Sequence, residues 1–236
     1  MNKFFKIYDE FEYDIIRKFN EQEFYRRFHR FSKKEFTYYL LQLGYLSLEF
    51  VKFLERAKLP LKKEGGKEAI REILRDEIPA SGPTHQDNRF TDLIESGLTR
   101  EKILNTLPTK QTKKIIRKYY ELIKYPQDNY DLRALIISRV IGEVLVGETY
   151  KHVVKGLQKH YGLKPEKSLF YTFHWQHDQK GGKGDKIDSG HTEYYDNVLK
   201  ELIRDKKSLY IAKESALTAY KVRCKFHEQF IKNHHL

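Results

Sequence analysis

Carboxylates stand among apolar residues at two separate places in this chain. Glu143 lies in the apolar run Val140–Val146, and Glu77 follows Ile70 and Ile73 at helical spacing. An ionised carboxylate is costly to bury unless it is paired with a cation or bound to a metal. We therefore expect both glutamates to have partners in the protein interior.

Histidines supply the other half of a possible metal site. Those that stand in aromatic surroundings or near an acid are His85, His174, His177 and His191. Asp188 precedes His191 by three residues, so a helix there would point both side chains in one direction. Three carboxylates and three imidazoles that converge in a helical core would suit two iron or manganese ions.

Each of these groups also has a simpler explanation. A buried glutamate can pair with lysine or arginine, and His174 and His177 can be aromatic-like core residues. Asp188 can cap the helix that follows it, and local sequence favours that role. His85 beside Thr84 has little in its surroundings to mark it as a ligand. Residue types and spacing alone leave these alternatives open.

Helices must position these groups, because nearly the whole chain has helical periodicity. Ser32 and Glu35 form a capping-box pattern, and we expect that helix to end at Gly44. A second helix is expected from Ser47 to just before Pro60. Further helices are predicted at about 66–78, 85–96, 100–106, 111–124, 129–160, 164–178, 191–204 and 208–233. No segment alternates with period two. The expected fold is all-α, a single bundle of seven to nine helices over residues 1–236.

Composition narrows the class of protein. The chain has 236 residues, with 45 Lys+Arg against 33 Asp+Glu and a net charge of +12. The basic residues are scattered among acidic ones, so we expect no nucleic-acid partner. The chain has no apolar run near 18 residues and no signal peptide, and its single cysteine, Cys224, excludes disulfides and cysteine zinc sites. These features predict a soluble, cytoplasmic protein without a membrane partner.

The ordered combination of these segments resembles the heme-oxygenase-like di-iron oxidases, and in particular their CADD-like branch. The matching segments are Ile73–Glu77, His85, Arg89–Leu98, Glu143, Gly156–Leu163, the aromatic segment with His174, and Asp188–His191. They occur in the family's order over about residues 25–205. The resemblance implies a seven-helix bundle without heme, in which three helices hold two iron ions, or one iron and one manganese.

The resemblance also implies a set of metal ligands. This set is Glu77, His85, Glu143, His174, Asp188 and His191, with Glu143 as the bridging carboxylate. The family's His-x-x-x-Asp-x-x-His motif is interrupted here. His174 and Asp178 match its first half, whereas Asp188 and His191 match its second, with a glycine- and lysine-rich segment inserted between them. Asp178 and Asp188 are therefore alternatives, and we favour Asp188 because of its spacing to His191.

The activity that the resemblance implies is activation of dioxygen to oxidise a small organic substrate. In the CADD branch, the oxidised group is a tyrosine of the protein itself. The candidates for a pocket-lining or redox tyrosine are Tyr38, Tyr39, Tyr45, Tyr171 and Tyr194, although a structural role is the simpler explanation for each. The expected partners are the substrate and dioxygen, with a homodimer as one possible assembly.

Three other functions are alternatives to the di-iron oxidase for a helical bundle of this kind. A thiaminase of the TenA kind would need a cysteine nucleophile in the core, but Cys224 stands among charged residues. Heme binding would need a proximal histidine in the first helices, where His29 is the candidate. The remaining alternative is a non-catalytic, CADD-like interaction protein that has lost the metal site.

Overall fold

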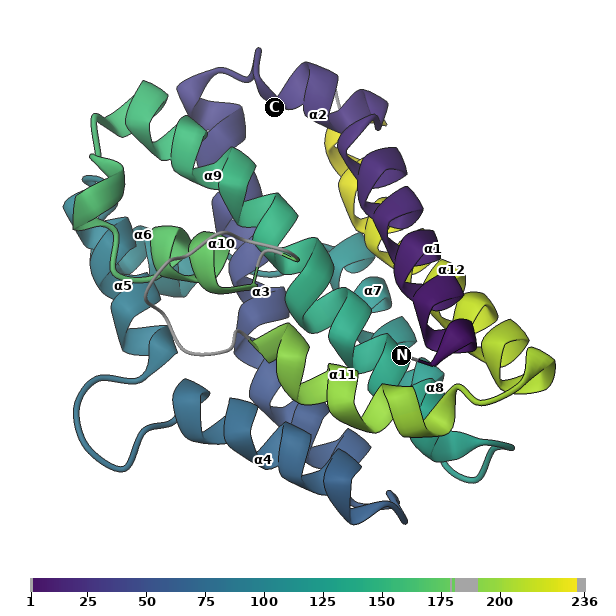
Figure 1. Cartoon of the computed structure of the whole chain (residues 1–236). Coiled ribbons are helices and arrows are strands. Elements are labelled where there is room, and N and C mark those ends of the chain that lie inside the picture. The colour runs from purple at the N-terminus through teal and green to yellow at the C-terminus, as the bar shows by residue number, and fades with distance from the viewer. Residues whose placement is uncertain (1, 179, 181–190, 233–236) are drawn as a thin grey trace.

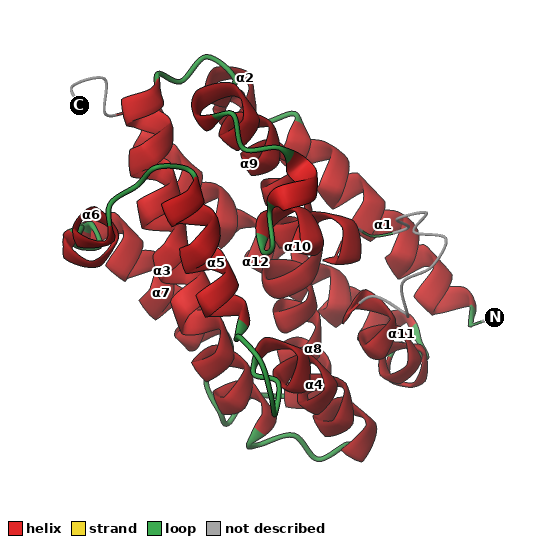
Figure 2. Ribbon diagram, turned by 90° about the vertical axis from the view of Figure 1, so that its left-hand side faces the viewer, coloured by secondary structure: helices red, strands yellow, loops and turns green. Residues whose placement is uncertain are grey.

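The computed structural model describes residues 2–178, 180 and 191–232, and this part of the chain is helical without any β-strand (Figure 1, Figure 2). The helices are α1 (Lys3–Asn20), α2 (Glu23–Phe28), α3 (Lys33–Lys58), α4 (Glu64–Glu77), α5 (His85–Glu95), α6 (Arg100–Asn105), α7 (Lys110–Leu122), α8 (Tyr130–Arg139), α9 (Leu145–Tyr161), α10 (Tyr171–Asp178), α11 (His191–Leu202) and α12 (Lys206–Lys232). A π-helical turn (Val140–Val144) joins α8 to α9, and a 3-10 turn (Pro165–Lys167) precedes α10. The all-α prediction is confirmed, although the expected seven to nine helices are divided into more segments.

The helices pack around one cluster of buried hydrophobic residues. Helices α1 and α12, from opposite ends of the chain, lie side by side (Figure 1). Helix α10 packs on α9, and α11 packs on α4 and α8. Within the described residues, no helix is both long enough and apolar enough to cross a membrane.

The expected break at Gly44 is wrong, because α3 continues without interruption from Lys33 to Lys58. Gly44 is buried, and a Cβ atom there would lie 2.4 Å from Arg89 Nη1. The glycine therefore allows close approach of α5 and does not end a helix. The Ser32 capping box is present as predicted, whereas the Ser47 hydroxyl bonds to Tyr150 Oη at 2.9 Å and starts no new helix.

The long helix expected over residues 129–160 is interrupted at the π-helical turn that contains Glu143. Such turns are rare, and they occur frequently at functional sites. Beside Glu143, Gly142 lacks a side chain where the Phe50 ring approaches: a Cβ atom would lie 2.3 Å from Phe50 Cε2. The local sequence thus combines an irregular turn with close packing against α3.

Asp92, on α5, holds the start of α10 in place. Its buried carboxylate accepts hydrogen bonds from the Ser168 hydroxyl (2.6 Å) and from the backbone N–H groups of Leu169, Phe170 and Tyr171 (2.7, 3.0 and 3.2 Å). These N–H groups precede or begin the helix and lack intrahelical partners. The acid therefore performs at long range the function that an N-cap residue performs locally.

A buried ionic cluster attaches α1 to the rest of the bundle. The Glu12 carboxylate accepts from Arg139 Nε (2.9 Å), and Lys180 Nζ lies 2.8 Å from its other oxygen. Arg139 also pairs with Asp196 and donates to the carbonyl of Thr192 on α11. Burial opposes ionisation of Glu12, but the Arg139 and Lys180 charges outweigh it and lower its pKa from 4.5 to about 2.

Substituting Asp92→Asn should destabilise the protein by about 2–3 kcal/mol, since an amide replaces a charged acceptor and faces N–H donors. Urea denaturation measures the loss, and hydrogen exchange at Leu169–Tyr171 should accelerate. The control is Glu95→Gln, an exposed acid on the same helix. A cost within about 0.5 kcal/mol of the control would show that the carboxylate does not hold α10.

Glu12→Gln should change how stability depends on pH. Because the folded pKa of Glu12 is lowered, its stabilisation is present above pH 4.5 and is lost as the pH falls through about 2. The wild type should therefore be more stable than the variant by about 3 kcal/mol near neutrality, and this advantage should shrink on acidification.

Chemical denaturation at a series of pH values measures this difference. Asp14→Asn, at an exposed position on α1, serves as the control and should show no such convergence with the wild type. If the wild type is more stable than Glu12→Gln by the same amount at every pH, the lowered pKa of Glu12 is contradicted.

Candidate metal centre

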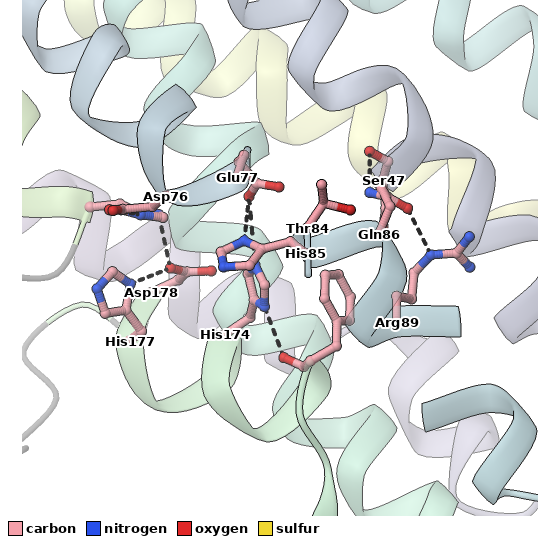
Figure 3. Close-up of polar contacts among 12 residues, drawn as sticks. Ser47, Asp76, Glu77, Thr84, His85, Gln86, Arg89, His174, His177 and Asp178 are labelled. Atoms are coloured by element: carbon pink, nitrogen blue, oxygen red, sulfur yellow. Dashed lines mark hydrogen bonds and ion pairs between the residues drawn. The ribbon is translucent and has the colours of Figure 1, made fainter. Parts of the chain in front are cut away.

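A first group of potential ligands joins three helices. Glu77 ends α4, His85 begins α5, and His174 lies on α10. Glu77 Oε1 lies 3.2 Å from His85 Nδ1 and 3.6 Å from His174 Nε2 (Figure 3). One ligand atom from each residue lies within 4.8 Å of the others, so they could hold a single ion. The structure therefore brings three of the predicted ligands together.

Local structure directs these side chains toward one another. Glu77 shares a face of α4 with the fully buried Ile70 and Ile73, so its carboxylate enters the interior. The Thr84 side chain caps α5 and fixes the first turn, where His85 lies. A capped helix start is well ordered, which suits a ligand position.

The His174 ring is oriented by its own helix. Its Nδ1 atom lies 2.8 Å from the carbonyl oxygen of Phe170, which makes Nδ1 the donor. The Nε2 atom then faces Glu77. A backbone carbonyl that holds one ring nitrogen, so that the other can coordinate, is the usual support of a metal-binding histidine.

A second group consists of His177, Asp178 and His191, whose ligand atoms also lie within 4.8 Å of one another. Asp178 Oδ1 lies 3.1 Å from His177 Nδ1 and 3.4 Å from His191 Nδ1. Glu143, from the π-helical turn, reaches the same nitrogen of His191 with Oε2 at 3.1 Å. Its carboxylate interacts electrostatically with Asp178 and with Glu77. Glu143 thus contacts the second group directly and lies within electrostatic range of the first.

Sequence reasoning did not select two residues of this cluster, Asp76 and His177. Asp76 is half-exposed near the end of α4, yet its Oδ2 lies 3.0 Å from His191 Nε2. His177 stands three residues after His174, and this spacing puts both on neighbouring positions of one helix surface. His177 was among the histidines considered from the sequence, but it was left out of the expected ligand set despite this spacing.

The structure bears directly on one of the two alternative aspartates. Asp178 is fully buried and lies in the second group of ligands. Asp188, which spacing favoured, lies outside the described residues. Asp178 nevertheless lies 3.4 Å from His191 although thirteen positions separate them in the sequence, whereas the choice of Asp188 stays a prediction.

Burial and pairing compete in setting the charges of these groups. Burial opposes ionisation of Glu77, but hydrogen bonds from His174 and His85 outweigh it and lower its pKa to about 2. The Glu77 contact in turn outweighs burial at His174 and raises the pKa of that imidazole. Burial raises the pKa of Glu143, and the nearby Asp178 charge raises it further. The carboxylates and imidazoles of the core therefore stabilise one another's charged forms, whereas burial disfavours the charged form of Glu143.

Unsatisfied atoms in the cluster fit a divalent metal. Glu143 Oε1 and Asp178 Oδ2 are buried and have no hydrogen-bond partner. Buried carboxylate oxygens without partners are costly, and a bound cation would satisfy both. Mixed carboxylate and imidazole donors suit iron and manganese.

A mostly apolar cavity adjoins the first group. Glu77 and His174 form part of its wall, together with Phe50 and Phe53 of α3, Gly142 of the π-helical turn, and residues of α7, α9 and α12. Apolar cavities with a few polar groups are the usual form of small-molecule sites. Part of the cluster, Glu77 and His174, therefore borders an apolar cavity.

The five tyrosines singled out from the sequence differ in position. Tyr39 and Tyr171 are buried, the Tyr45 hydroxyl donates to the carbonyl of Thr106 (2.5 Å), and Tyr194 lies with its ring centroid 6.3 Å from that of His191. Tyr38 packs against Phe230. The tyrosines that line the cavity are instead Tyr119, Tyr120 and Tyr150.

Cys224 lies on α12 in a separate depression with Phe24, Tyr220 and His227. Burial raises the pKa of its thiol to about 11, so the nucleophilic thiolate is scarce at neutral pH. This position does not suit a nucleophile acting in the cavity beside Glu77. His29, the candidate heme ligand, is exposed.

Comparison with known proteins identifies relatives by structure. No protein-family model and no curated protein sequence matches the chain. A CADD-like protein of unknown function from Nostoc punctiforme matches with a TM-score of 0.71 and 14% identity, over 97% of this chain and 98% of that one. A domain of unknown function with a heme oxygenase-like fold, from Shewanella denitrificans, matches with a TM-score of 0.70 and 14% identity (95% and 90% covered). A TenA homolog from Pseudomonas syringae matches with a TM-score of 0.67 and 12% identity (98% and 93% covered).

These matches confirm, at the level of the fold, the resemblance that the sequence indicated. Identities of this size establish shared architecture and leave activity to be argued from the site. The chain has the heme-oxygenase-like fold, in the form shared by CADD-like proteins and TenA homologs.

Proposed function

We propose that this protein is a non-heme di-iron oxidase or oxygenase that acts on a small organic substrate. The observation that carries the proposal is the presence of two carboxylate–imidazole groups in the core, with Glu143 in contact with the second and the first on the wall of an apolar cavity. The structural similarity to CADD-like proteins is consistent with it.

The chain offers enough ligands for two ions. Glu77, His85 and His174 would hold one iron, whereas Asp178 and His191 would hold the other. Glu143 would serve both, His177 is an additional donor, and Asp188 is the alternative to Asp178. When bound, two ferrous ions supply the electrons and open coordination positions needed to reduce dioxygen beside a substrate.

The protein's own groups orient the donors and shelter the reaction. The Phe170 carbonyl holds His174, and the Asp76 carboxylate holds His191 by its Nε2 atom. The walls of the cavity limit access of water to the substrate. These supporting contacts set the direction of each ligand before any metal arrives.

Anaerobic titration with ferrous iron should reach two irons per chain, and exposure to oxygen should then give a transient visible absorption band. Glu143→Gln and His191→Gln remove ligands while keeping similar shape, so each should lower iron affinity by at least about tenfold or abolish one site. Glu72→Gln, at a surface position of α4, is the matched control and should bind as wild type does.

Circular dichroism and thermal unfolding of each variant establish that it is folded. If the folded wild type takes up no iron, or if both ligand variants bind as the wild type does, the di-iron proposal is wrong. A folded protein that binds a partner without metal would then support the interaction-protein alternative.

The choice between the two aspartates can be tested on the same assay. We expect Asp178→Asn to remove iron from the second group, because Asp178 lies beside His191, and Asp188→Asn to retain two irons. Asp76→Asn should weaken binding by about 10–100-fold without removing a ligand, since it supports His191 from behind. Loss of iron in Asp188→Asn, with full binding in Asp178→Asn, would reverse the assignment.

A further inference from the structure

A buried arginine on α12 lacks the partner that its charge requires. Arg223 is 2% exposed, and its Nη2 atom donates to Thr149 Oγ1 at 3.2 Å. Its Nε atom is buried without a hydrogen-bond partner. Arg139, equally buried, shows the usual arrangement, with carboxylates of Glu12 and Asp196 around it. Burying a guanidinium without a counter-charge is strongly destabilising.

The groups that face Arg223 are neutral. The hydroxyls of Tyr25, Tyr39 and Tyr119 interact with it, and burial raises the pKa of each well above the neutral range. His227, one turn further along α12, is kept neutral by burial and by the Arg223 charge itself. Among residues 2–178, 180 and 191–232, no carboxylate forms an ion pair with this guanidinium. Its positive charge is therefore uncompensated within the described structure.

Arg223 lines the same cavity as Glu77 and His174. The Tyr150 hydroxyl, also on the cavity wall, hydrogen-bonds to Ser47 at 2.9 Å and lies within electrostatic range of both Arg223 and Glu77. Apolar groups, including Phe50, Phe53 and Ile141, make up much of the remaining wall. One cavity thus offers a buried cation, an apolar interior and the proposed metal ligands.

We infer that the substrate is a carboxylic acid with an apolar body, whose carboxylate pairs with Arg223 while the body extends toward Glu77 and His174. This inference rests on the proposed function and names the class of substrate. A guanidinium matches a carboxylate in charge and in its planar, two-pronged geometry. A phosphate group carries more charge than one arginine offsets, and the apolar walls would not solvate it.

The experiment measures binding of matched ligand pairs by isothermal titration calorimetry. The probes are 3-phenylpropanoate and octanoate, each compared with its own primary amide, and acetate as an acid without an apolar body. The protein is used without metal, so that the acids cannot bind by coordinating iron. We expect each acid to bind at least about tenfold more tightly than its amide, and acetate to bind weakly.

The variants are Arg223→Met and Arg223→Lys, with Lys225→Met as the control for net charge on the same helix. Lys225 is exposed, so the control should bind the acids as wild type does. Arg223→Met should reduce the affinity for each acid to that for its amide, and Arg223→Lys should restore part of it. Arg223→Met should also unfold at the same or a higher temperature than the wild type, because it removes an unpaired buried charge. A merely structural arginine would instead lower the unfolding temperature when replaced.

Equal affinity for acid and amide, absence of binding by either acid, or acid binding unchanged in Arg223→Met would overturn the inference. Iron titration of the same variants separates this result from the proposed function. Arg223→Met should still bind two irons, so loss of acid binding alone identifies the role of the arginine. The protein could also bind acids through Arg223 and yet take up no iron. That result would support the inference about the acid-binding cavity and would contradict the di-iron proposal.

Discussion

The cost of burying charge governs how this bundle is assembled. Glu12, Glu77 and Asp178 are carboxylates with almost no contact with water. Each must find a positive or donating group, and that group lies on another helix: Arg139 for Glu12, and His174 for Glu77. Helix packing is therefore specified by polar pairs as well as by apolar surface, because a shift of one turn would separate the partners and leave both unsatisfied.

Buried charged groups with a full set of partners and buried groups without one are found in different parts of the molecule. Around Arg139 the charges balance, and the cluster joins α1, α8 and α11. Around Arg223 and Glu143 they do not, and the groups without partners lie at or next to one cavity. Natural proteins keep unsatisfied buried groups where a ligand completes them. The same physical rule thus separates a structural cluster in one place from the place where we propose a binding site.

Small residues and an irregular turn shape the space between these clusters. Gly142 admits the Phe50 ring against the π-helical turn, and Gly44 admits the Arg89 side chain against α3. A side chain at either position would require its neighbour to move into space that is already filled. The position of Glu143, within that turn, depends on this close contact.

The sequence by itself determined the all-α class and most helices after residue 32, and it pointed to several side chains of the candidate cluster, because caps, periodicity and buried acids are local features. Helices α1 and α2 were not predicted individually. The Ser32 capping box formed as expected, and Glu77 was recognised from its position on the apolar face of α4. Only the tertiary structure decided that Gly44 marks a helix contact, that Asp178 meets His191, and that Arg223 faces the cavity. Each of these depends on segments far apart in the chain, whose relative placement is set by packing and leaves no periodic signal in the sequence.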